Sequence, residues 1–183
     1  MGALVDDYVR ALAERPRPVR VVTKGGVWHQ ALIDRALRVL TLGGQDRYLT
    51  EYVTTLGHTI YVPEGWERVP ERERYKVLRH EAVHVAQFER YGWVGMALGY
   101  VLLPLPAGLA WCRARLEWEA YAETLRATWE LDGPDAARAP ALRAHIIARF
   151  TGPDYGWMWP FAGAVGRWID DELAALSRDP ARL

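Results

Sequence analysis

The sequence is poor in cysteine and in lysine. A single cysteine, Cys112, stands among 183 residues, so no intrachain disulfide can form and a disulfide-stabilised scaffold is excluded. Lysine occurs only at Lys24 and Lys76, and arginine supplies the remaining positive charge. Acidic and basic residues balance at 23 each, which leaves no net charge. Without a basic excess, the composition gives no indication of a nucleic-acid partner.

Targeting and membrane signals are also weak. The first residues lack a basic start followed by a long apolar core, so we expect no signal peptide and a cytoplasmic location. The longest uncharged stretch covers residues 93–112 and contains Pro104 and Pro106. Because this proline pair would interrupt a membrane span, we favour a buried helix and turn. A segment that re-enters or rests on a bilayer is the alternative, since membrane helices tolerate some proline.

Half of the residues are hydrophobic, which is enough for the core of one domain with an extension. Runs of β-branched and aromatic residues predict strands at residues 19–23, 37–42 and 52–62, the last broken near Gly57. Residues 27–38 fit a helix or a strand. Helices are predicted for residues 3–15, 70–91, 113–131, 135–150 and 164–176. The pattern favours an α+β fold, in which a small antiparallel sheet packs on a pair of helices and the C-terminal part is helical.

One motif carries the chemistry. His80, Glu81 and His84 form a His-Glu-x-x-His string in the middle of the helix predicted to follow Pro70. Residues four apart share one helix face, so both imidazoles can reach one ion. Zinc accepts histidine nitrogens in a tetrahedral site and keeps one position for water when the site is catalytic. Glu81 flanks the metal and is predicted to act as the general base toward that water.

The alternative is that His80 and His84 are ordinary helix-surface histidines at helical spacing. The surrounding residues argue against it, because apolar side chains occupy most sides of this helix: Val77, Leu78, Val83, Val85 and Phe88. Histidines in such a place need partners for their polar nitrogens. We therefore expect a catalytic or structural zinc ion at His80 and His84.

Zinc needs a third protein ligand. Gln87 and Arg90 stand where the metzincin pattern has glycine and histidine, so that subclass is excluded. A glutamate on the helix predicted over residues 113–131 is the other choice. We favour Glu117, which shares a small, semi-polar face, over Glu119, which aligns with a solvated, ion-paired face. His145 is the first substitute if neither glutamate binds.

These residues match the motifs of a known family in part. The His80 motif, followed by Glu117-Trp118-Glu119-Ala120-Tyr121, resembles the thermolysin-like gluzincin metallopeptidases, whose later helix often carries Glu-x-x-Ala-Asp. Tyr121 replaces the aspartate, and the frame that starts at Glu119 matches as well. The compact layout is most similar to minimal gluzincin domains of bacteria and phages. The resemblance covers about residues 50–130, and it implies a single zincin-like domain over residues 1–183 with its core at about 19–130.

The resemblance also implies a substrate site. Gluzincins place an edge strand beside the cleft, and His58 to Val62 occupies that place in the sequence. Such a strand would pair with an extended peptide through main-chain hydrogen bonds, with His58, Ile60 and Val62 on one side. A second electrophile would steady the oxyanion. The candidates are Tyr155, His145 and Arg149.

The expected function is therefore hydrolysis of a peptide or protein substrate by zinc-activated water. One alternative is a zinc-bound structural module with little activity, inside a larger assembly such as a phage particle or an injection machine. The intact Glu81 argues against it, because a purely structural site has no need for a base. The other alternative is a membrane-associated protease that uses residues 93–112. The oligomeric state is not predicted.

Overall fold

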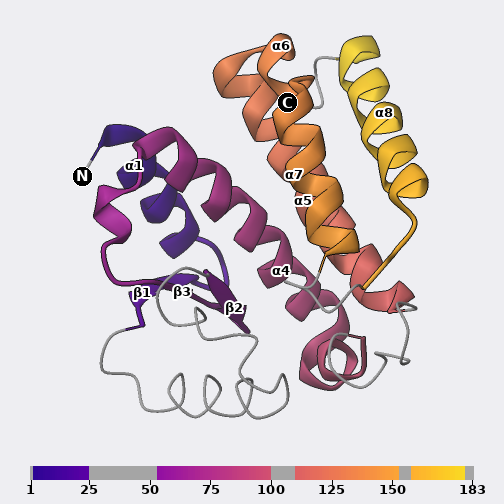
Figure 1. Ribbon diagram of the computed structural model, residues 1–183. Coiled ribbons are helices and arrows are strands. Elements are labelled where there is room, and N and C mark those ends of the chain that lie inside the picture. Colours follow the sequence, from indigo (N-terminus) through magenta and orange to yellow (C-terminus); the bar gives the residue numbers. More distant parts are fainter. Residues whose placement is uncertain (1, 25–52, 100–109, 153–157, 180–183) are drawn as a thin grey trace. The chain divides into compact units, whose positions relative to one another are not determined.

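The computed structural model describes residues 2–24, 53–99, 110–152 and 158–179 (Figure 1). The expectations for residues 27–38 and 37–42, and the candidate Tyr155, lie outside these ranges. The chain separates into two compact units, residues 1–85 and 86–183, and the division falls inside the long helix that carries the histidines. Both α-helices and a small sheet are present, so the predicted α+β class is confirmed. The single zincin-like domain stays a prediction.

The first unit is built around a small sheet. It contains, in order, α1 (Ala3–Ala13), β1 (Arg20–Thr23), β2 (Thr54–Leu56), β3 (Thr59–Val62), the short 3-10 helix η1 (Trp66–Arg68) and the first part of α4 (Glu71–Ala97). Gly57 takes a positive φ of 59° in the tight turn that joins β2 to β3. The strand pair predicted across residues 52–62 is thus confirmed.

The sheet is mixed, not wholly antiparallel as expected. Its order is β1-β3-β2, with β2 antiparallel to β3 and β1 parallel to β3. A hairpin turn fixes the antiparallel pair locally, whereas β1 joins through a long connection, which is what a parallel pairing requires. Consequently β3 lies at the centre of the sheet, and the expected edge strand at His58 to Val62 is wrong.

Helix α4 begins where the sequence predicts. Pro70 precedes its first residue, and Glu71 and Glu73 lie in the first turn, where acidic groups interact favourably with the helix dipole. Gly92, the predicted stop, has φ 65° and ψ 178°, so the helix is interrupted there before it continues to Ala97. Trp93 and Val94 in this continuation and Leu98 just after it are exposed, so the burial expected for residues 93–112 is not found at these positions.

The described residues of the second unit beyond α4 are mainly helical. They form α5 (Trp111–Asp132), the short α6 (Pro134–Ala137), α7 (Pro140–Thr151) and α8 (Ala162–Arg178). The predicted helix over residues 135–150 is in fact two, because Pro140 disfavours the helical conformation for the residue before it. Ala139 accordingly is extended, with φ −57° and ψ 131°.

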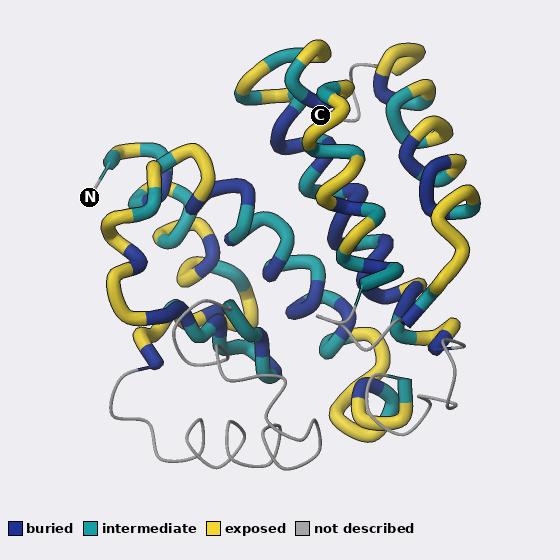
Figure 2. Tube along the Cα trace, in the orientation of Figure 1, coloured by how far each residue is buried: buried dark blue, intermediate teal, exposed yellow. Residues whose placement is uncertain are grey.

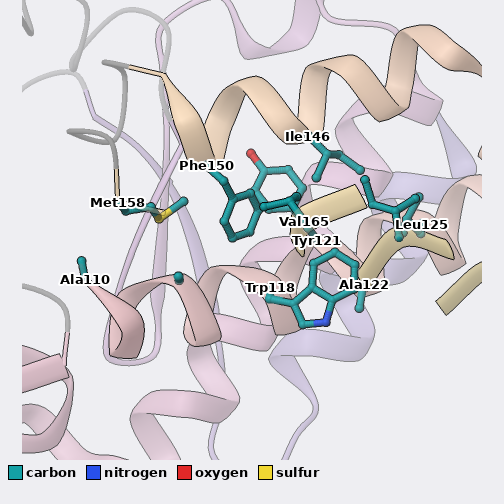
Figure 3. Close-up of a cluster of buried hydrophobic side chains, with 11 residues drawn as sticks. Ala110, Trp118, Tyr121, Ala122, Leu125, Ile146, Phe150, Met158 and Val165 are labelled. Atoms are coloured by element: carbon teal, nitrogen blue, oxygen red, sulfur yellow. The ribbon is translucent and has the colours of Figure 1, made fainter. Parts of the chain in front are cut away.

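The core of this unit joins α5, α7 and α8. Figure 3 shows Trp118 and Tyr121 of α5 near Phe150 of α7, whose ring centroid lies 6.5 Å from Trp118 and 5.6 Å from Tyr121. Trp168 of α8 adds an edge contact at 5.9 Å from Phe150. Buried residues recur along α5, α7 and α8, and α5 is buried over the largest share of its length (Figure 2). Within the described ranges, no helix combines the length and apolar character that crossing a membrane would need.

Candidate metal centre

His80 and His84 lie one turn apart on the uninterrupted part of α4. Their ring centroids are 5.1 Å apart, and the ring planes meet at 75°. His84 is buried, with 7% of its surface exposed, and His80 is half-buried. The helical spacing thus brings both imidazoles to one face, as the motif predicts.

Glu81 lies between them in sequence but makes a contact of its own. Its side chain is buried, and its Oε2 atom accepts a hydrogen bond of 2.7 Å from the hydroxyl of Thr55 on β2. The same hydroxyl lies 3.4 Å from the main-chain oxygen of Glu81. The sheet therefore holds the candidate base from one side, and this contact was not predicted from the sequence.

Glu117 of α5 completes a group of three possible ligands. Each member of the group offers one possible ligand atom, and these atoms lie within 4.8 Å of one another; the members are His80, His84 and Glu117. Glu117 is almost fully buried, with 1% exposure. Ligand atoms around a tetrahedral zinc ion lie about 3.4 Å apart, so rotamer shifts of roughly an ångström would close the group on an ion. Two imidazoles and one carboxylate suit zinc and leave one position open.

Glu119, the alternative ligand, is not in this group. Its Oε2 atom accepts a hydrogen bond of 3.0 Å from Nε2 of Gln87 and lies 3.9 Å from Nη1 of Arg90. The expected ion-paired character of this residue is therefore found, although the partner is on α4. The geometry favours Glu117 as the third ligand, as the sequence does.

The remaining candidates lie elsewhere. His145 and Arg149 are on α7, where His145 is exposed and Arg149 half-buried; neither is in the ligand group. Ile60 and Val62 are 0% and 3% exposed, so they belong to the core. Both neighbours of β3 occupy its main chain, and the predicted peptide-binding role of His58, Ile60 and Val62 is wrong for that reason.

Two residues at this centre were missed in the sequence. Thr55 is a plain strand threonine, and nothing in the sequence pairs it with Glu81. In the sequence, Gln87 was considered only as a mismatch to the metzincin pattern. However, a residue three positions after His84 lies on the same helix face as His84. A polar residue on the buried side of a helix is the signal that could have singled it out.

Comparisons of the chain with protein-family models, with curated proteins and with solved structures found no match. Function is therefore inferred from the residues of this centre and from their geometry.

Proposed function

We propose that this chain is a zinc-dependent metallopeptidase of the gluzincin type. The observation that carries the proposal is the group formed by His80, His84 and Glu117. The motif spacing accounts for the positions of the two histidines. It does not account for the position of Glu117, which is a buried residue of another helix. The three side chains would hold one zinc ion, which would supply a Lewis acid for the substrate carbonyl and lower the pKa of a bound water.

Glu81 supplies the proton chemistry. Glu81 directly follows His80 in the motif, and its carboxylate would take a proton from the attacking water. The same carboxylate can then pass that proton to the leaving amine, which conserves protons over the reaction. The hydrogen bond from Thr55 holds Oε2 and so limits rotation of the carboxylate about its last bond.

The test combines zinc content with peptide hydrolysis. We expect about one zinc per chain in the wild type, by the three-ligand chemistry of such sites. Glu81→Gln removes the base and keeps the ligands, so it should retain zinc and lose hydrolysis of a mixed fluorogenic peptide library. Glu89→Gln, on the same helix but outside the ligand group, is the matched control and should retain both.

Each other result has a definite meaning. A wild type that takes up no zinc at neutral pH would overturn the metal site and the proposal with it. Zinc without hydrolysis in the wild type would favour the structural module. Hydrolysis that survives Glu81→Gln would exclude Glu81 as the base.

A further inference from the structure

Gln87 is a polar side chain in a fully buried place. It is 1% exposed and is among the largest buried side chains of the chain. Its Nε2 atom donates to the main-chain oxygen of Leu116 at 2.9 Å and to Oε2 of Glu119 at 3.0 Å. A side-chain amide has two N–H donors on its nitrogen. The main-chain oxygen and the carboxylate oxygen can only accept, so Nε2 of Gln87, and not its oxygen, must face both of them.

These two acceptors bracket the proposed third ligand. Leu116 precedes Glu117 directly, and Glu119 follows it by two residues on the same helix. On α4, Gln87 lies one turn beyond His84, on the face that carries both histidines. The amide therefore ties α5 to α4 at the level of the metal ligands.

The hydrogen bond from Gln87 to Leu116 is buried, and the one to Glu119 is partly buried. Leaving the amide or the Leu116 oxygen without a partner in the interior would incur the full desolvation penalty of that group. Sliding or rotating α5 by one residue would break both hydrogen bonds at once. The second bond also occupies the Glu119 carboxylate, which would otherwise compete with Glu117 for a cation.

We propose that Gln87 is the positioning residue that selects Glu117 as the third zinc ligand, by fixing the register of α5 and by holding Glu119 away from the metal. This inference rests on the proposed zinc site. Gln87 itself acts only through Glu117 and does not touch the metal.

The experiment is a double-mutant cycle on zinc affinity, measured by competition with a chromophoric chelator. The four proteins are wild type, Gln87→Met, Glu117→Ala and the double variant. Methionine keeps the length of the side chain and removes both donors. We expect Gln87→Met to weaken zinc binding about 10–100-fold, the usual effect of losing a residue that orients a ligand.

The cycle separates positioning from general destabilisation. If Gln87 acts through Glu117, the double variant should bind zinc no more weakly than Glu117→Ala alone. A further loss in the double variant would show that Gln87 has only a structural role and would overturn the inference. Thr128→Val, which removes a buried hydroxyl from α5 about three turns from Glu117, should leave zinc affinity unchanged.

A second variant of Gln87 and the zinc binding of the wild type serve as further controls for this experiment. If Gln87→Met fails to fold, Gln87→Asn replaces it, because the shorter amide cannot reach both acceptors and should weaken zinc binding in the same direction. If the wild type binds zinc and Gln87→Met and Gln87→Asn bind it equally well, only this inference fails. If the wild type binds none, the proposed function fails first.

Discussion

The hydroxyl of Thr55 on β2 donates a hydrogen bond of 2.7 Å to the Oε2 atom of Glu81 on α4. Both residues are buried, at 8% and 7% exposure. A charge-assisted hydrogen bond of this kind is about twice as strong as a neutral one. The contact therefore links the edge of the sheet to the carboxylate that we propose as the base.

Removing this hydroxyl should slow the reaction without emptying the metal site. For Thr55→Val we expect kcat to fall about 10-fold, since hydrogen bonds to charged groups contribute about 1.5–3 kcal/mol. KM and zinc content should stay the same. Thr55→Ser keeps the hydroxyl and should keep most of the activity. Steady-state kinetics on one cleaved peptide give kcat and KM for the wild type and both variants. An unchanged kcat in Thr55→Val would refute the positioning of Glu81 by Thr55.

The two candidate glutamates should differ in zinc content. Glu117→Ala removes the proposed third ligand and should lower bound zinc well below one per chain after dialysis, while Glu119→Ala should retain about one. Elemental analysis of both purified variants measures this directly. The reverse order, with zinc lost only in Glu119→Ala, would reassign the third ligand.

Gly92 should be sensitive to a side chain because of its backbone. Its φ of 65° with ψ of 178° lies in a region that is essentially restricted to glycine. A Cβ there would meet no heavy atom within 4 Å, so strain and not collision sets the cost. Gly92→Ala should lower the free energy of unfolding by about 1–3 kcal/mol.

Gly163 provides the control for that measurement. It lies in α8, where an added Cβ would come no closer than 3.7 Å to Arg167, so Gly163→Ala should be neutral or slightly stabilising. Chemical denaturation of the two variants beside the wild type compares them. Equal stability of Gly92→Ala and wild type would mean that the interruption of α4 is not maintained in solution.

An exposed ion pair between α7 and α8 should give a small, pH-dependent stabilisation. The guanidinium of Arg143 hydrogen-bonds to Asp170 and lowers the pKa of that carboxyl. A lowered folded-state pKa stabilises the fold above the unfolded pKa of aspartate, and the gain is lost as pH falls through the folded pKa. Because both groups are largely exposed, the gain is about 0.5 kcal/mol or less.

Asp170→Asn isolates this contribution. The variant should be slightly less stable than wild type at about pH 7, and the difference should be smaller at about pH 3, below the unfolded pKa of aspartate. Urea denaturation at both pH values measures it. A difference that is the same at both pH values would assign the effect to packing instead of charge.

Several features could be predicted because they are local. Pro70 and Gly92 mark the start of α4 and its interruption, and the turn at Gly57 separates two strands. The spacing of His80 and His84 places both rings on one helix face by helical geometry alone. The break before Pro140 is equally local, although one helix was predicted across it over residues 135–150.

Other features depend on which elements meet. The sequence by itself determined the α+β class, the helix that carries the motif and the types of residue that could bind a metal ion. Only the tertiary structure decided that β3 is central, that Thr55 binds Glu81, and that Glu117 and not Glu119 joins the histidines. The physical reason is that periodicity and turn residues act within a few positions of the chain. Strand order and helix register are instead set by contacts between distant residues, such as the hydrogen bonds from Gln87 to Leu116 and Glu119.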